Sequence, residues 1–316
     1  MLLIRGQHNL RAAHRGCVAT IGNFDGVHLG HQAVFEALKA RAREHGLPSL
    51  VITFEPHPLE YFLPEAAPPR LMRAREKLEA IERAGIDRVL LLRFDQDLAL
   101  LPAQDFIRDY LVEALGVRHL YVGDDFRFGH RRQGDFGLLQ AEGARHGFRV
   151  ESLATVSDAC GRISSTRIRE ALAAGDLATA RCCLGRDYSI SGRVGHGHKR
   201  GRQIGFPTLN VGLARRRTPL RGVFAVRVEG LEDAPLPGVA NLGNRPTLEG
   251  DDRFLLEVHL FDFDREVYGR QVRVNLVERL RDERRFESFD ALRAQILQDA
   301  QQAREILQAN NRRATS

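Results

Sequence analysis

The sequence predicts two domains of different fold class, an α/β domain followed by a β domain. Up to about residue 184, short β-rich runs alternate with helical segments, which indicates a doubly wound parallel sheet covered by helices. Beyond that point, short runs are separated by Gly, Pro and Asn, which is typical of an antiparallel barrel or sandwich. A length of 316 residues suits two such units. We therefore expect domains at residues 1–184 and 185–316.

The first domain is expected to contain five strands with helices between them. The strand candidates are residues 17–24, 50–54, 88–94, 119–123 and 149–155. The helix candidates begin near Gln32, Arg75, Gln104 and Phe136. Glycines stand where these helices should end, at Gly46, Gly85, Gly116 and Gly147. Ligands of such sheets bind at the carboxyl ends of the strands.

The second domain is expected to be mainly β structure with one terminal helix. Its strand candidates are residues 188–194, 206–211, 222–230, 238–243, 254–263 and 271–277. A helical pattern follows from about Ser288 to Gln308. The apolar residues expected on its buried stripe are Leu292, Ile296, Ala300, Ala303 and Leu307.

The charge and cysteine content narrow the class of protein. The formal net charge is +6, but only Lys39, Lys77 and Lys199 are lysines, and the arginines are scattered through both halves. This scattered distribution of positive charge is unlike a concentrated nucleic-acid-binding surface. Small phosphate-bearing ligands would explain the excess of positive charge equally well. Four cysteines lack the paired spacing of zinc or disulfide frameworks. No apolar run approaches the length of a membrane span. We expect a cytoplasmic protein without nucleic-acid or membrane partners, and the oligomeric state stays open.

The segment IGNFDGVHLGH, residues 21–31, falls where the first strand ends and the first helix begins. A strand-to-helix turn directs backbone N–H groups and the positive end of the helix dipole at its ligand, which favours phosphate. Glycines let the backbone approach that ligand closely. His28 and His31 are three residues apart, so two imidazoles can face the same side and stabilise a transferring phosphoryl or nucleotidyl group. A metal pair or two solvent-exposed histidines are the alternative interpretations.

Four segments in order carry a resemblance to a known family. GNFDGVHLGH resembles the HxGH-type nucleotidyltransferase signature of prokaryotic FAD synthetases, and TFEPHP (53–58), GDDFRFG (123–129) and ISSTRIRE (163–170) agree with it in order and spacing. The resemblance implies a Rossmann-like nucleotidyltransferase domain that adenylylates FMN to FAD.

The resemblance also implies site residues in this domain. His28 and His31 would act on the ATP phosphates as catalytic residues, and Asp125 resembles a ligand-contacting position. The ATP- and phosphate-binding residues would be Gly22, Asn23, Phe24, Gly30, Ser164, Ser165, Thr166 and Arg167. The flavin-binding residues would be Pro56, His57, Pro58 and Asp125. Independently, the hydroxyls of residues 164–166 suit a helix N-cap near a polyphosphate, although an ordinary helix start explains them too.

A second motif, GRVGHGHKRGRQIGFPTLN, covers residues 192–210. Its glycines and cations would form a flexible loop able to wrap a nucleotide, and it is not a Walker loop, because the G-x-x-x-x-G-K-[ST] pattern is absent. A generic basic hairpin is the alternative. From GFPTLN through GVANLGNRPT to LEVHLFDFDREVYG, however, the sequence resembles riboflavin kinases, which implies an antiparallel barrel that phosphorylates riboflavin to FMN.

The kinase resemblance assigns further residues. Thr208 and Asn210 would place oxygens around Mg²⁺ and the ATP phosphates, although Leu209 replaces the alanine usual in this motif. Magnesium prefers a few hard oxygen ligands together with phosphate. The ATP-binding residues in the preceding loop would be Gly197, Lys199, Gly201 and Arg202.

Glu257 is a carboxylate within an apolar strand, where it should share one face with Leu255, His259 and Phe261. Burying a carboxylate there is costly unless it is functional or well paired. The resemblance makes it the general base that activates the ribityl hydroxyl, whereas a solvent-exposed edge glutamate is the alternative. Arg281 matches a recurring position of the kinase family's closing segment and is assigned to the flavin.

The whole sequence is therefore interpreted as a member of the prokaryotic bifunctional riboflavin kinase/FAD synthetase family. It would use ATP with Mg²⁺, and riboflavin, FMN and FAD would be its substrates or products. One rival is an adenylyltransferase for a pantetheine or nicotinamide precursor, which the kinase-like half argues against. The other rival is a nucleic-acid-binding protein, for which the sequence shows no zinc-finger spacing or RNA-binding aromatic motif.

Overall fold

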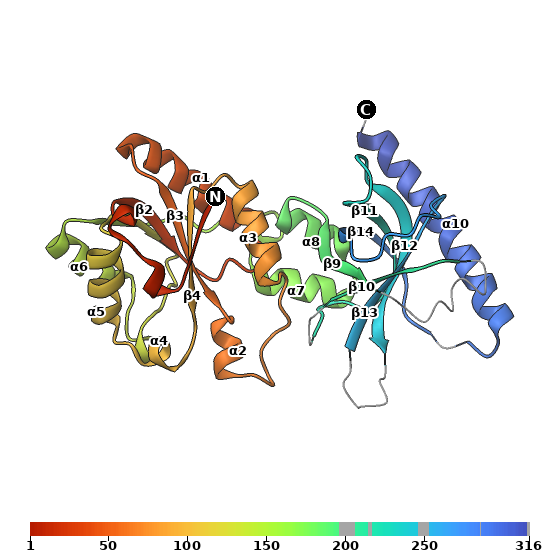
Figure 1. Cartoon of the computed structure of the whole chain (residues 1–316), viewed down its shortest axis with the longest axis horizontal. Helices are drawn as coiled ribbons and strands as arrows, with labels where there is room; N and C mark the ends of the chain where they lie inside the picture. Colours follow the sequence, from red (N-terminus) through yellow and green to blue (C-terminus); the bar gives the residue numbers. More distant parts are fainter. Residues whose placement is uncertain (196–205, 214–216, 246–252, 285, 315–316) are drawn as a thin grey trace. The chain divides into compact units, whose positions relative to one another are not determined.

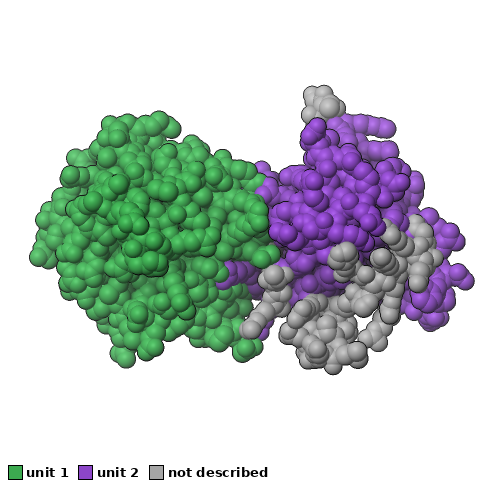
Figure 2. Space-filling view, viewed as in Figure 1, with its two compact units in different colours: residues 1–68, 72–164 green, residues 69–71, 165–316 purple. Residues whose placement is uncertain are grey.

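The computed structural model describes residues 1–195, 206–213, 217–245, 253–284 and 286–314. Contacts divide the chain into two compact units. The first comprises residues 1–68 and 72–164, and the second comprises residues 69–71 and 165–316 (Figure 2).

The first unit is built on a parallel six-stranded sheet in the order β1-β4-β3-β2-β5-β6, of which β2, β3 and β4 are labelled in Figure 1. Its strands are β1 (Leu2–Arg5), β2 (Cys17–Ile21), β3 (Ser49–Glu55), β4 (Arg88–Arg93), β5 (Val117–Val122) and β6 (Arg149–Ser152). The chain winds outward from β2 through β3 to β4 and then crosses to β5 on the other side of β2. This reversal of strand order confirms the doubly wound α/β prediction. In such sheets ligands bind where the order reverses, so we expect the ligand near the carboxyl end of β2.

Helices cover both faces of the sheet because the buried strands are apolar on both sides. On one face, Val18 and Val51 pack with Phe35 of α1 (Leu29–His45) and Ile81 of α3 (Ala74–Arg83). On the opposite face, the core joins alternate strand residues to three further segments. These segments are α5 (Ala103–Phe106), its π-helical continuation η3 (Ile107–Ala114) and α6 (Phe136–His146).

Glycine ends several of these helices, as predicted. Gly46 after α1 and Gly147 after α6 are left-handed, with φ of 61° and 76°, a conformation that costs glycine little. The helix predicted to start near Gln32 begins earlier, at Leu29, because His28 caps it.

Several short elements of this unit were not predicted. They are β1, the hairpin of β7 (Ser157–Asp158) and β8 (Gly161–Arg162), the helices α2 (Pro58–Phe62) and α4 (Gln96–Leu100), and the 3-10 turns η1 (Gln7–Asn9), η2 (Ala12–His14) and η4 (His130–Arg132). Each is too short to show a hydrophobic period in the sequence.

The second unit contains a closed antiparallel barrel in the order β10-β13-β12-β11-β14-β9, which confirms the barrel prediction. Its strands are β9 (Tyr188–Gly195), β10 (Leu209–Gly212), β11 (Gly222–Glu229), β12 (Leu236–Arg245), β13 (Arg253–Leu260) and β14 (Gln271–Arg281). Phe224, Leu256 and Val274 are among its fully buried residues.

Helix α10 (Phe289–Ala314) runs along the outside of the barrel (Figure 1). Ala303 and Leu307 pack on Val223 and Val239, so the outer face of β11 and β12 is buried as well. Ser288 caps this helix by accepting a hydrogen bond from the Ala291 N–H at 3.1 Å. The predicted start is therefore confirmed, and the helix continues beyond the predicted end at Gln308.

Helices α7 (Ser165–Ala174) and α8 (Leu177–Leu184) belong to the second compact unit. Arg181 of α8 donates a hydrogen bond to the Val277 carbonyl of β14 at 3.0 Å. The compact units therefore separate earlier in the chain than residue 184, and the division into functional domains at 1–184 and 185–316 stays a prediction.

Candidate active sites

The turn between β2 and α1 has an unusual backbone. Phe24 and Val27 have left-handed φ values of 50° and 43°, and Gly26 lies between them at 87°. Non-glycine residues rarely adopt this conformation, and such strain concentrates at ligand-binding segments. Gly22 leaves room for the Phe24 ring, since a Cβ there would lie 3.0 Å from it. The turn thus lies at the carboxyl end of a central strand and leads directly into a helix N-terminus.

His28 and His31 lie together at this helix start. Their rings stack with centroids 3.6 Å apart and an interplanar angle of 18°. The His28 Nδ1 accepts a hydrogen bond from the His31 N–H at 3.3 Å, so His28 is itself the N-cap of α1. Gly30 leaves room for this stack, because any other residue at that position would place its Cβ 3.0 Å from the His28 ring.

The electrostatic environment keeps His31 neutral. Burial, then His28, then Lys77 lower the pKa of His31 well below its usual value. Its Nδ1 is buried and has no hydrogen-bond partner among the described residues. A neutral imidazole with an unused nitrogen can donate to or accept from a ligand.

The predicted flavin segment at Pro56, His57 and Pro58 forms the entry to α2. The Glu55–Pro56 peptide bond is cis, and the His57 Nδ1 caps α2 by accepting from the Leu59 N–H at 3.1 Å. The neighbouring Tyr61 and Phe62 each make edge contacts with Phe94. Phe62 is 57% exposed, so an open aromatic surface adjoins the segment.

Asp125 follows β5 and forms an ion pair with Arg162, whose Nη2 lies 2.9 Å from the Asp125 Oδ2. Arg162 was not predicted as a site residue, although it directly precedes the ISSTRIRE segment. Ser164 closes the first unit, whereas Ser165, Thr166 and Arg167 start α7 in the second unit. Their predicted role at the histidine turn stays a prediction.

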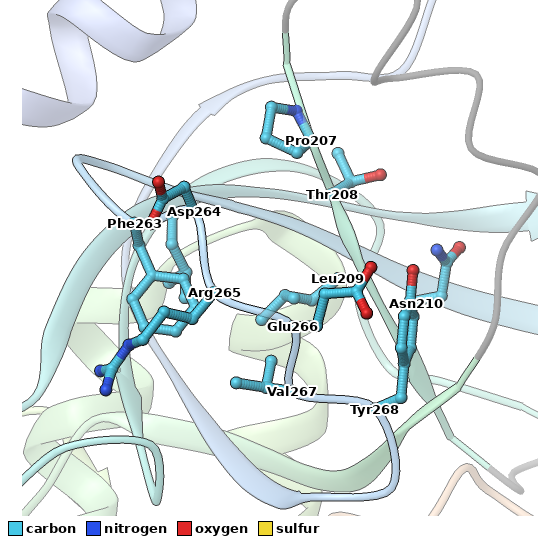
Figure 3. A pocket seen from close by; sticks show the side chains of 11 residues that line it. Pro207, Thr208, Leu209, Asn210, Phe263, Asp264, Arg265, Glu266, Val267 and Tyr268 are labelled. Carbon is cyan, nitrogen blue, oxygen red and sulfur yellow. The ribbon is translucent and has the colours of Figure 1, made fainter.

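The barrel carries a pocket between the start of β10 and the loop after β13. Thr208 and Asn210, both predicted as metal ligands, line one side, and residues Phe263 to Tyr268 line the other (Figure 3). Pro207 is fixed beside them, because the His259 Nδ1–H donates to its carbonyl at 2.9 Å. Thr208 and Asn210 are therefore brought together at one pocket.

Glu257 is half-buried on β13, in register between Asn210 of β10 and Asn241 of β12. Leu255 and His259 share this half-buried face, as predicted. Phe261 lies beyond the strand and packs with the α10 core. The Asn241 Oδ1 is buried with no partner among the described residues. Glu257 thus belongs to a row of polar side chains across three strands.

Arg281, predicted to contact the flavin, is held by α10. Its Nε and Nη2 both donate to the Asp299 carboxylate, with the Nη2 bond 2.7 Å long. The Asp299 side chain is only 4% exposed. Gln295 also donates to Asp299 at 2.7 Å, so the carboxylate is well satisfied. The predicted loop residues Gly197, Lys199, Gly201 and Arg202 lie outside the described residues.

The described residues contain no cluster of three or more His, Cys, Asp or Glu side chains arranged to hold a metal ion. No helix in the described part of the chain has the length and apolar character needed to cross a membrane. Fold and sites together define a two-unit protein that joins a nucleotidyltransferase-like α/β unit to a closed antiparallel β barrel.

Comparisons with known proteins give a family match for each half of the chain. Residues 10–167 match the family model of FAD synthetase, and residues 184–307 match that of riboflavin kinase. The bifunctional riboflavin kinase/FMN adenylyltransferase of Escherichia coli strain K12 is 53% identical over 307 residues, covering 97% of this chain and 98% of the relative. The protein of the same name from Pseudomonas fluorescens is 52% identical over 306 residues, covering 97% and 98%.

A crystal structure described as a macrolide-efflux protein from Streptococcus pneumoniae has the same overall fold. It superimposes with a TM-score of 0.80 at 32% identity, covering 95% of this chain and 97% of that one. Both family models and the curated relatives identify the family. The chain belongs to the bifunctional riboflavin kinase/FMN adenylyltransferase family.

Proposed function

We propose that this chain carries out both reactions for which its family is named. In the first, ATP phosphorylates riboflavin to FMN and ADP leaves. In the second, FMN attacks the α-phosphorus of ATP, so that FAD forms and pyrophosphate leaves. The observation that carries the proposal is the match of two different family models to the two halves of one chain, at residues 10–167 and 184–307.

For the kinase reaction, we assign the general base to Glu257. The proton of the ribityl hydroxyl would pass to its carboxylate while the hydroxyl oxygen attacks the γ-phosphorus of ATP. Half-burial between Asn210 and Asn241 supports this role, because amide groups on both sides can orient a carboxylate and a substrate hydroxyl. Arg281 forms hydrogen bonds with Asp299. This pairing supports a role for Arg281 in placing the segment after β14, in addition to its assigned contact with the flavin.

Thr208 and Asn210 fit the Mg²⁺ that this reaction needs. Both line one pocket and offer neutral oxygens, which suit a cation that also binds the ATP phosphates. The ion, when bound, would shield the phosphate charge.

For the adenylyl transfer, we assign charge stabilisation to the α1 N-terminus and the histidine pair. The helix dipole favours an anion there, and imidazole N–H groups can donate to phosphate oxygens as negative charge moves to pyrophosphate. The two rings stack with centroids 3.6 Å apart, so both imidazoles lie together at the start of α1. Four free cysteines favour a reducing compartment, which supports the cytoplasm as the site of action.

The direct test is to incubate the pure protein with riboflavin, ATP and Mg²⁺ and to separate the flavins by chromatography. FMN should appear first and FAD later, with ADP released in the amount of FMN and FAD together and pyrophosphate in the amount of FAD. Absence of both products, together with steeply salt-dependent binding of DNA or RNA, would contradict the proposal.

A further inference from the structure

Lys77 is a buried lysine that faces the turn between β2 and α1. It lies on α3, on the same side as Ala80 and Ile81, and the residue is only 6% exposed. Its Nζ donates to the Asn23 carbonyl at 3.1 Å, the Thr53 hydroxyl at 2.9 Å and the Phe54 carbonyl at 3.2 Å. An ammonium has three hydrogens, and these three acceptors match them. Lys77 therefore joins the histidine turn to the end of β3.

This contact fixes a peptide plane in the turn. The Asn23 carbonyl accepts from both Lys77 and Thr53, so it points toward the interior. In a planar trans peptide the following N–H points the opposite way, so the Phe24 N–H faces away from Lys77. Among the described residues, no acceptor pairs with this N–H. It is left as a backbone donor for a ligand.

The same contact supports the strained part of the turn. Phe24 is left-handed at φ 50°, and its ring meets the His31 ring edge-on at 5.1 Å. Strained residues persist only where the surrounding structure holds them in place. Lys77 holds the residue before Phe24, and Phe24 in turn packs on His31. The Lys77 ammonium is thus connected to the histidine pair through the contacts of Asn23 and Phe24.

We propose that Lys77 is a positioning residue for adenylyl transfer, which holds the Asn23–Phe24 peptide and the histidine pair in the geometry that receives the ATP phosphates. This inference rests on the assignment of adenylyl transfer to the histidine turn. Lys77 acts through its neighbours, because its own hydrogens bind protein acceptors.

The test compares Lys77→Met, Lys77→Arg and the matched control Lys39→Met in the full-length protein. Lys39 lies in the same unit but pairs with Glu36 on α1, away from the turn. Lys77→Met should lower kcat/KM for adenylylation of FMN by roughly tenfold to a hundredfold, as expected for misplaced binding groups. Lys77→Arg should retain more activity than Lys77→Met, because it keeps a charged donor there. Riboflavin phosphorylation should change by less than about twofold in every variant.

A pH profile separates positioning from general stabilisation of the fold. Lys77 lowers the pKa of His31, so its removal should move the acidic limb of the adenylylation profile to higher pH. Wild-type adenylylation by folded Lys77→Met would overturn the proposal, as would an unshifted acidic limb. If Lys77→Met does not fold, Lys77→Arg decides: equal loss of both activities overturns the proposal, and selective loss of adenylylation supports it. A His28→Ala/His31→Ala variant of normal activity would instead refute the assignment of the site.

Discussion

Asn210 of β10 and Glu257 of β13 lie directly opposite each other in the closed barrel. Residues opposed in this way have Cβ atoms about 5 Å apart, so one substrate group can reach both side chains. Because Asn210 also lines the pocket with Thr208, the register places the assigned base beside the assigned metal ligands.

Replacing Glu257 by Gln should abolish most riboflavin phosphorylation. Gln keeps the size and hydrogen-bonding shape of Glu but cannot accept the hydroxyl proton, and general-base catalysis is worth about a hundredfold to ten-thousandfold. Adenylylation of added FMN should remain. Both half-reactions are measured on one preparation, with Glu278→Gln on the exposed surface of β14 as the control. Near-normal FMN production by a folded variant would remove Glu257 from the mechanism.

Replacing both His28 and His31 by Ala should remove FAD formation selectively. The loss of electrostatic stabilisation commonly costs on the order of a hundredfold or more in rate. FMN formation should survive. Since His28 also caps α1, His28→Asn is tested separately, because Asn preserves a capping side chain. His45→Ala, exposed at the other end of the helix, is the control. Wild-type adenylylation by the double variant would leave the histidines without a catalytic role.

The thermal stability of the first unit should fall in mild acid. Burial lowers the pKa of His31 and of His119, whereas both would titrate near about 6.5 in an unfolded chain. The unfolded state then binds more protons below that pH, so the stabilisation present above about pH 6.5 is lost as the pH falls toward the folded values. Melting curves from pH 8 to about pH 5 test this. His31→Gln should flatten the slope, and exposed His8→Gln should not.

Replacing Asp299 by Ala should destabilise the barrel unit. The change leaves the Arg281 guanidinium without its carboxylate, and breaking a buried pair costs about 3–5 kcal/mol. Arg281 is 20% exposed, so the lower end of that range is expected. Denaturant unfolding measures the free energy, with exposed Gln298→Ala as the control. An unchanged unfolding midpoint would show that the pair adds nothing to stability.

A fragment that contains the barrel should make FMN alone, and it should be more stable when α7 and α8 are included. Residues 165–316 retain Arg181 on the Val277 carbonyl, whereas residues 188–316 lose this contact and expose the surface under Leu184. Both fragments are assayed with riboflavin and ATP, and their melting temperatures are compared. A folded but inactive longer fragment would place part of the kinase site in the first unit.

Much of the fold could be predicted because its signals are local. Short β-rich runs indicated the long strands, and Gly46 and Gly147 marked helix ends. The sequence signal for the N-terminal strand β1 was weaker, because this strand has four residues and Ile4 is the only one of the four that is buried. Its place beside β4 depends on a pairing with residues far along the chain.

The site residues could be proposed from motifs, but their partners could not. Asn241 and Glu257 meet through strand register, and Asp299 reaches Arg281 from a helix, so both relationships require the folded chain. Lys77 did leave one signal in the sequence: it is a lysine three and four residues before Ala80 and Ile81, on the apolar face of a helix. A charge at such a position is costly without partners, which identifies it as a residue with a role.

The closed barrel has a consequence for how copies of this chain can associate. A barrel offers no unpaired strand edge, so apart from the two-residue strands of the β7-β8 hairpin, the open edges in the described part of the chain belong to the parallel sheet. Those edges, β1 and β6, are four residues each and carry Arg5, Arg149 and Glu151. Short, charged edges are poor templates for an incoming strand, so any self-association should proceed through side-chain surfaces rather than through continuation of the sheet.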